Sequence, residues 1–214
     1  MRQGESIIAP GHFVIEAGET ANHIYVLLEG WGLVYPRIPN RPLRATEIAL
    51  PGDIIGLQGG LTGTFSHSVI ALTRARCCVI DGALPRKIAE IGGSLSIAQV
   101  KHLVHERSRR ERMAALLGGE NPMRRLAYLF LETFSRLKAI GIADEMMCPF
   151  PVRLRHVAEI VGLSEVHLSR MLAKMRKAGI VELANNILCI NDRDALIGTA
   201  GLNPADWLKE RFIL

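Results

Sequence analysis

The chain has 214 residues, of which 49% are hydrophobic, 22% charged and 5% aromatic, with a formal net charge of +5. This composition is typical of a globular protein with one large or two small domains, and it excludes disordered, collagen-like and fibrous classes. No apolar run approaches the roughly 18 residues that a membrane span needs, and the N-terminus lacks a secretion-signal pattern. We therefore expect a cytoplasmic protein that has no membrane partner.

The net charge is unevenly distributed along the chain. Residues 1–93 hold eight basic and eight acidic residues, whereas residues 94–214 hold 18 and 13. Within this second part, residues 150–180 carry six basic residues and two acidic ones. Such an excess is typical of a protein that binds a polyanion, although a solvated helix face carries the same kind of charge.

Residues 1–93 consist of short apolar runs that are separated by glycine and proline. Thirteen of the 20 glycines of the chain lie in this segment. Strands this short between so many turn residues predict an antiparallel sandwich or barrel. The expected strands lie at residues 12–16, 24–28, 33–35, 45–50, 68–72 and 77–80.

The four cysteines show neither the C-x-x-C spacing of a zinc or redox site nor the density of a disulfide scaffold. They are Cys77, Cys78, Cys148 and Cys189. Adjacent residues on a strand point to opposite faces, so at most one of Cys77 and Cys78 faces the core. We expect all four to be reduced thiols, most of them buried.

Residues 94–117 contain no glycine or proline and predict one helix about 36 Å long. Its apolar residues concentrate near the two ends, with the charged segment 105–112 between them. A helix this long cannot bury its apolar positions on one small β domain, so we expect part of it to pack on a second copy in a homodimer. A second helix is expected after Pro122, followed by a loop at residues 144–151.

Residues 154–178 carry two apolar stripes at helical spacing, separated by Gly162, Leu163 and Ser164. Two short helices joined by a three-residue turn form a helix-turn-helix, in which Ser164 is placed to cap the second helix. The outward face of that helix is small and basic. Arg170 can contact guanine O6 and N7, and an apolar group can contact a thymine methyl. Plain helical hairpins account for most isolated matches to this pattern.

A β-hairpin is expected directly behind the second helix. The runs Ile180–Leu183 and Ile187–Ile190 flank a turn at residues 184–186. Such a hairpin forms the wing of a winged helix-turn-helix. The expected fold class is therefore α+β, with an antiparallel β domain, a long helix and a winged helix-turn-helix in that order.

This order of parts resembles the Crp/Fnr family of bacterial transcription regulators. The resemblance is carried by residues 17–30 (AGETANHIYVLLEG), residues 50–56 (LPGDIIG), the long helix, and residues 157–182 (VAEIVGLSEVHLSRMLAKMRKAGIVE). It implies a cyclic-nucleotide-binding-type β-roll, a dimerisation helix, and a domain that binds a palindromic operator in double-stranded DNA. It also implies a contact with RNA polymerase, on a surface that the sequence does not place. The three parts are expected at residues 1–93, 94–118 and 119–214.

The resemblance also indicates a ligand region, and there the chain departs from the nucleotide-binding members. Leu57 follows Gly56 where those members have the glutamate that holds the ribose, and His67-Ser68 stand where they have Arg-Ser for the cyclic phosphate. A neutral histidine is a poor replacement for a bidentate arginine. We predict that cyclic AMP does not control this protein. The candidate residues for another ligand are Gly56, Leu57, Gln58, His67 and Ser68.

The iron–sulfur and haem variants of the family are also not expected. No cysteine precedes Cys77, and Gln58-Gly59-Gly60 stand where haem-bound members have His and Cys. The histidines of the first 93 residues lack the His-x-His spacing of a cupin metal site. We therefore expect no metal and no cofactor.

The second helix of the helix-turn-helix matches the family in part. Members that read one common half-site have Glu, Ser and Arg at the positions of Val166, Ser169 and Arg170. Valine cannot accept a hydrogen bond from cytosine N4, so we expect a different half-site, with His167 or Glu165 supplying another contact. The full set of candidate DNA-binding residues is Arg153, Ser164, Glu165, Val166, His167, Ser169, Arg170, Lys174 and Lys177.

The sequence thus predicts a homodimeric DNA-binding transcription regulator without catalytic residues. Two other classes stay open. One is a metalloenzyme of cupin type, for which the chain shows no ligand set. The other is a ligand-binding or interaction module of jelly-roll type, whose helix-turn-helix serves only packing.

Overall fold

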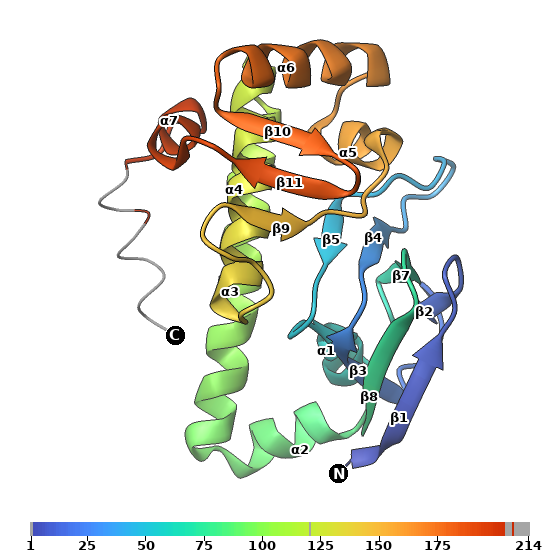
Figure 1. Ribbon diagram of the computed structural model, residues 1–214. Helices are drawn as coiled ribbons and strands as arrows, with labels where there is room; N and C mark the ends of the chain where they lie inside the picture. The colour runs from blue at the N-terminus through green and yellow to red at the C-terminus, as the bar shows by residue number, and fades with distance from the viewer. Residues whose placement is uncertain (1, 120, 204–206, 208–214) are drawn as a thin grey trace. The chain divides into compact units, whose positions relative to one another are not determined.

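The computed structural model describes residues 2–119, 121–203 and 207 (Figure 1). The chain divides into two compact units, which meet within one long helix at residues 109 and 110. Antiparallel sheets make up most of the first unit, and helices with a small sheet make up the second. The expected α+β fold is confirmed. No helix in the described residues combines the length and the apolar character that crossing a membrane requires.

Two four-stranded antiparallel sheets form the β-roll of the first unit. The first has the order β1-β8-β3-β6, with β1 at Arg2–Ile8, β8 at Ala75–Asp81, β3 at His23–Glu29 and β6 at Ile54–Ile55. The second has the order β2-β7-β4-β5, with β2 at Phe13–Ile15, β7 at His67–Ala71, β4 at Gly32–Pro36 and β5 at Glu47–Ala49. Six of these strands lie where the apolar runs predict them.

Sequence patterns do not predict β1, β6 or the short helix α1 (Leu57–Thr62), and each has a physical reason. β1 carries aliphatic residues only at its last two positions, and Gly4 lies at a register shift with a φ of 136°. β6 has only two residues. α1 contains Gly59 and Gly60, which lower helix propensity but leave room for close neighbours. A Cβ at Gly60 would lie 2.9 Å from the carbonyl oxygen of Gly82.

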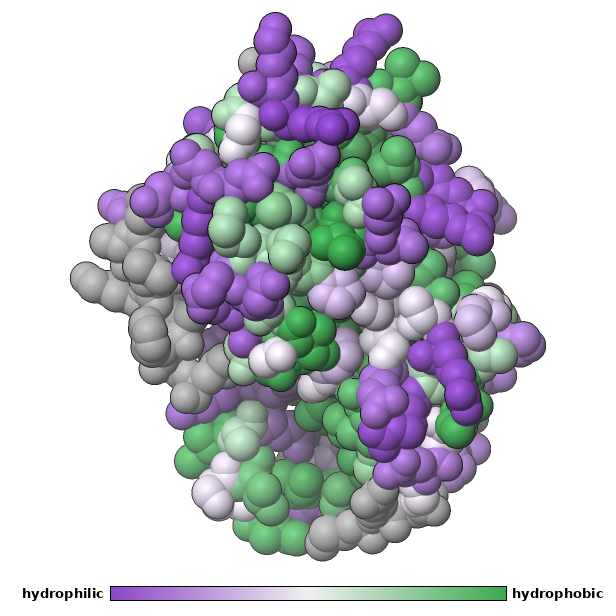
Figure 2. All heavy atoms as spheres, in the orientation of Figure 1, coloured by the Kyte–Doolittle hydropathy of each residue, from purple (hydrophilic) through white to green (hydrophobic). Residues whose placement is uncertain are grey.

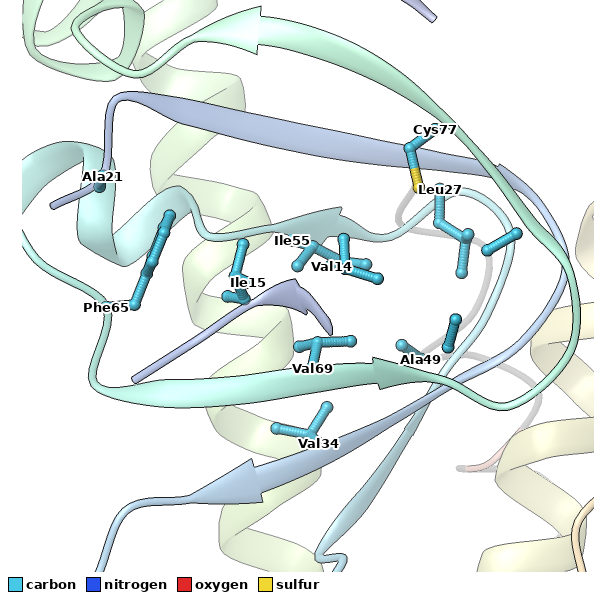
Figure 3. Close-up of a cluster of buried hydrophobic side chains, with 12 residues drawn as sticks. Val14, Ile15, Ala21, Leu27, Val34, Ala49, Ile55, Phe65, Val69 and Cys77 are labelled. Atoms are coloured by element: carbon cyan, nitrogen blue, oxygen red, sulfur yellow. The ribbon is translucent and has the colours of Figure 1, made fainter. Parts of the chain in front are cut away.

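Aliphatic and aromatic side chains from both sheets form the core of the β-roll (Figure 3). Leu27, Val69 and Cys77 are at most 1% exposed. Cys78, on the opposite face of β8, is partly exposed, as the alternation of a strand requires. The cysteines are free thiols, with Cys77 and Cys148 buried.

Two helices follow the β-roll. α2 spans Leu84–Ile91, and α3 spans Gly93–Leu117, where the sequence predicts a single long helix. Gly92 and Gly93 join them with φ values of 72° and 80°, which glycine adopts without steric cost. The 25-residue α3 carries only one buried residue, Glu106.

The second unit contains the remaining helices and a three-stranded sheet of order β10-β11-β9. Its elements are α4 (Pro122–Ala139), β9 (Met147–Pro149), α5 (Leu154–Val161), α6 (Glu165–Lys177), β10 (Val181–Ala184), β11 (Ile187–Ile190) and α7 (Arg193–Thr199). The expectation of a plain loop at residues 144–151 is wrong in part, because β9 lies within it and pairs with β11. β9 is an edge strand, where proline is tolerated.

The core of the second unit forms around α4. Leu126, Phe130 and Phe134, at a spacing of four residues, are at most 1% exposed. The ring of Phe130 meets that of Phe150 edge to face, with centroids 5.4 Å apart. This packing holds α4 against the segment that leads into the helix-turn-helix.

Candidate nucleic-acid interface

The turn between α5 and α6 depends on a glycine and a serine. Gly162 ends α5 with a φ of 65°, in the left-handed region. A Cβ at this position would lie 3.1 Å from Leu117 Cδ2, so glycine is favoured by both conformation and space. Ser164 is the N-cap of α6, and its Oγ accepts a hydrogen bond from the backbone N–H of His167 at 3.2 Å. The predicted helix-turn-helix and its cap are both present.

α6 separates an apolar buried face from an exposed face. Leu168, Met171 and Met175 are buried, and Leu172 is partly buried. Figure 2 shows hydrophilic side chains over much of α6, at the top of the view. The exposed residues of the helix include all the DNA-binding candidates on it: Glu165, Val166, His167, Ser169, Arg170, Lys174 and Lys177. The structure thus brings these candidates together on one exposed surface, which we call the α6 face.

The positive charge of the α6 face is available for a partner. Within the described residues, Arg170, Lys174 and Lys177 form no ion pair, whereas Arg176 lies 3.0 Å from the carboxylate of Glu182. An unpaired, exposed guanidinium retains all its donors for a phosphate or a guanine edge. The three unpaired cations therefore form the basic part of this surface.

The serine hydroxyls of the α6 face make hydrogen bonds within the protein. Ser164 Oγ, as described above, accepts from the backbone N–H of His167. Ser169 Oγ donates to the carbonyl oxygen of Glu165 at 2.9 Å. A hydroxyl whose hydrogen is donated to its own helix presents only acceptor lone pairs to an outside group. This limits what Ser169 can offer a base in this arrangement.

Three polar side chains of α5 contact one another in series, near the start of this helix. Arg153, at the N-cap of α5, is exposed, as is Arg155. Arg155 Nε donates to Nε2 of the buried His156 at 3.1 Å, and His156 Nδ1 lies 3.5 Å from Glu159 Oε2. The sequence-based set of candidates omits Arg155 and His156. The signal that points to them is a histidine in the buried part of a short helix, directly after an exposed arginine.

The wing is a tight hairpin. β10 and β11 pair from Val181↔Ile190 to Ala184↔Ile187, which leaves Asn185 and Asn186 as a two-residue turn. Their φ values of 52° and 60° are those of a type I′ turn, for which asparagine is a preferred residue. The expected hairpin is confirmed, with a turn one residue shorter than predicted.

Gly56, one of the ligand candidates of the β-roll, lies beside a phenylalanine ring. The three atoms nearest to a Cβ built on Gly56 all belong to Phe65, the closest at 2.8 Å, and a Cβ on Gly59 would lie 2.5 Å from Phe65 Cδ1. Phe65 is 7% exposed and belongs to the β-roll core (Figure 3). The ring therefore fills the space beside the start of α1.

The other ligand candidates contact their own chain. Leu57 is 5% exposed. Ser68 Oγ accepts a hydrogen bond from the backbone N–H of Ala17 at 3.0 Å, and His67 Nδ1 lies 3.3 Å from Ser66 Oγ. The structure thus places Phe65, which the sequence-based set omits, closest to Gly56.

Two family models match the chain, in the order of its two units. A cyclic nucleotide-binding domain matches residues 6–90, and a Crp-like helix-turn-helix domain matches residues 124–198. The chain belongs to the Crp/Fnr family of transcription regulators. The helix-turn-helix of this Crp/Fnr regulator is accordingly a DNA-binding domain.

Relatives of this Crp/Fnr regulator cover most of its length. It is 24% identical to the anaerobic regulatory protein of Haemophilus influenzae over 196 residues, 92% of this chain and 76% of that protein. It is also 24% identical to the nitrogen fixation regulation protein FixK of Bradyrhizobium diazoefficiens, over 85% of this chain and 76% of that protein.

Solved structures show the same fold. FixK2 from Bradyrhizobium japonicum matches with a TM-score of 0.80 and 21% identity, over 91% of this chain and 96% of that one. A CRP-family transcriptional regulator from Thermus thermophilus matches with a TM-score of 0.67 and 20% identity, over 92% and 96%.

Proposed function

We propose that this regulator binds a palindromic operator as a homodimer in the cytoplasm, without catalytic activity and without control by cyclic AMP. The observation that carries the proposal is the exposed α6 face, where Arg170, Lys174 and Lys177 stand without ion pairs among the described residues. A helix of this kind enters the major groove and reads the edges of the bases. Arg170 donates to guanine O6 and N7, and the two lysines bind phosphates.

The part of α3 in the first unit supports the dimer, because its apolar side faces outward. Ile97, Val100 and Val104 follow one another at spacings of three and four residues, and they are 59%, 57% and 55% exposed. We call these three residues the α3 stripe. A stripe with this period is the seam of a two-helix packing.

The opposite side of the same segment is polar and packs on its own unit. Gln99 Nε2 donates to the carbonyl oxygen of Pro85 at 3.3 Å, and Arg109 lies 3.7 Å from the carboxylate of Glu47 on β5. Glu106 is buried at 7% exposure, with its carboxylate 3.6 Å from His102 Nε2. A helix whose polar side packs on its own unit and whose apolar side faces outward can bury that apolar side against another apolar helix. In a symmetric dimer, that helix is the same stripe of a second copy.

Two-fold symmetry of the dimer sets the form of the operator. Two recognition helices related by such an axis read two inverted half-sites, one helical turn of DNA or about 34 Å apart. By family resemblance, RNA polymerase is a further partner of the bound dimer.

The β-roll residues support independence from cyclic AMP, since they do not fit a cyclic nucleotide. By the resemblance, the phosphate would need a charged donor at the position of His67, and Phe65 places an apolar ring beside Gly56. The side chain of Leu57 offers no hydrogen-bonding group to a ribose, and the Oγ of Ser68 already accepts a hydrogen bond from the backbone N–H of Ala17. An anion there would lack the bidentate partner that an arginine supplies, and burying an anion without a charged partner costs several kcal/mol.

Selection of bound sequences from random DNA tests the operator. We expect an inverted repeat with its half-sites about one helical turn apart. Arg170→Ala should weaken binding by about 1–3 kcal/mol and relax one position of each half-site, because it removes a bidentate base contact. Lys177→Ala should weaken all sequences alike and reduce the salt dependence, because it removes a phosphate contact. Binding that neither substitution changes would overturn the assignment of the α6 face.

Sedimentation of two matched variants tests the dimer. Val104→Glu places a charge within the α3 stripe and should yield a monomer. Ala98→Glu places the same charge at an exposed position about a third of a turn from the stripe and should leave the dimer intact. A Val104→Glu protein that sediments as the wild type does would exclude this dimer. In a separate test, cyclic AMP should change the DNA affinity of neither the wild type nor the Ala98→Glu variant.

A further inference from the structure

Val166 is an exposed aliphatic side chain, so packing inside the protein does not explain why valine occupies this position. It is 63% exposed, whereas Leu168, Met171 and Met175 of the same helix are at most 8% exposed. Valine also has a lower helix propensity than the straight-chain residues that normally occupy exposed helix positions. Neither burial nor helix stability therefore accounts for a β-branched residue in the first turn of α6.

The surroundings of Val166 limit what this part of the α6 face can recognise. The nearby Ser164 Oγ accepts from the backbone N–H of His167, and Ser169 Oγ donates to a carbonyl of its own helix. Val166 and Arg170 are four residues apart, on the same side of α6 and about 6 Å apart along its axis. Base pairs are stacked about 3.4 Å apart, so these two side chains reach base pairs at most about two steps apart.

We propose that Val166 selects a thymine, by contact with its 5-methyl group, within two base pairs of the guanine that Arg170 contacts. Thymine is the one base with an apolar group in the major groove. Cytosine and adenine place an amino group there, which would lose water against an isopropyl group without gaining an acceptor. Val166 thus favours thymine and disfavours both of these bases. The inference rests on the proposed reading of DNA by the α6 face.

Deoxyuridine tests the proposal, because it differs from thymidine only by the missing methyl group. In the selected operator, each thymine of a half-site is replaced in turn, symmetrically in both half-sites, and affinity is measured by fluorescence anisotropy at fixed salt. At one position, the replacement should weaken wild-type binding about fourfold per half-site. This factor follows because a buried carbon group contributes about 0.8 kcal/mol and a tenfold change in affinity corresponds to about 1.4 kcal/mol. Val166→Ala should lose most of that penalty.

Two further variants separate this inference from the proposed function. Arg170→Ala should bind more weakly but keep the deoxyuridine penalty, because Val166 and not Arg170 contacts the methyl group. Leu154→Ala, which shortens an exposed aliphatic residue of α5, should keep both affinity and penalty. A wild type that binds the operator with no deoxyuridine penalty, or with a penalty that Val166→Ala retains, overturns the role of Val166 alone. Absence of any specific binding would instead overturn the proposed function.

A gain-of-function variant gives the converse result. Val166→Glu introduces an acceptor for cytosine N4 at the same place. Selection with this variant should replace the thymine by cytosine at one position of each half-site and leave the guanine unchanged. Selection of an unchanged site would contradict the proposal. Because Val166 is exposed, thermal melting of these variants should match the wild type within a few degrees.

Discussion

The packing of Phe65 against Gly59 predicts an energetic coupling between the two positions. Phe65→Ala removes a buried ring and leaves a cavity, which typically costs about 3–5 kcal/mol. Gly59→Ala adds a methyl group 2.5 Å from Phe65 Cδ1 and 3.1 Å from the Cβ of Ala21, well inside normal contact distance. Overpacking of this kind costs about 1–3 kcal/mol, of which the higher helix propensity of alanine returns about 1 kcal/mol.

The double variant should cost less than the sum of the single ones. Once the ring is gone, the methyl group that Gly59→Ala adds no longer clashes and fills part of the cavity. We expect a coupling of about 1–2 kcal/mol, above the roughly 0.5 kcal/mol within which independent sites add. Leu27→Ala serves as the control, because Leu27 is buried in the same core but is not among the nearest neighbours of Gly59.

The two tryptophans of the chain allow the first unit to be measured within the whole protein. Trp31 is buried in the first unit and Trp207 in the second. In a Trp207→Phe background, the fluorescence of Trp31 reports urea unfolding of the first unit. Additive costs for Gly59→Ala and Phe65→Ala would refute the packing described for the ring. A coupling of equal size between Gly59→Ala and Leu27→Ala would refute it as well.

Three further predictions concern the turn of the DNA-binding domain and the buried thiols. Gly162→Ala forces a left-handed residue toward Leu117, so it should lower the unfolding free energy of the second unit by about 1–2 kcal/mol in urea titrations. Burial and then the neighbouring thiol raise the pKa of Cys77 to about 11. The unfolded thiol ionises near pH 9, so the unfolding free energy of the first unit should fall between pH 9 and 11, and Cys77 contributes at most about 1.4 kcal/mol per pH unit to this slope. In urea titrations at several pH values, Cys77→Val should reduce the slope. Burial, followed by the charge of a nearby aspartate, raises the pKa of Cys148 to about 12, so iodoacetamide at about pH 8 should alkylate Cys189 well before Cys148, as peptide mass spectrometry would show.

Local periodicity was sufficient to predict which side chains of α6 are exposed. The buried side of α6 repeats every three or four residues, so the direction of Arg170 follows from the helical geometry alone. Ser164 follows from the chemistry of helix caps in the same way. What the sequence does not reveal is that the hydrogen of Ser169 is donated to its own helix, since that depends on a rotamer.

The interior of the β-roll could not be predicted in this way, because contacts between distant segments determine it. Phe65 is fixed by two backbone hydrogen bonds to residues more than 40 positions earlier: its N–H donates to the carbonyl of Glu19 at 3.0 Å, and its carbonyl accepts from Gly18 at 2.8 Å. Matching of motifs along the chain directs attention to His67 and Ser68. Only the pairing of the two segments shows which side chain lies beside α1.

In the proposed dimer, the α3 stripe would raise the affinity for DNA without contacting DNA. A single α6 reads only a few base pairs, and in a genome such short sites are very common. Once one half of a dimer is bound, the other half binds the second half-site at high effective concentration. The affinity of the dimer for a palindrome therefore far exceeds that of a monomer. Ile97, Val100 and Val104 would then determine operator affinity, although they contact no base. Because they are more than half exposed within their own unit, their loss should reduce DNA binding and remove only the concentration-dependent part of the unfolding free energy that the dimer contributes.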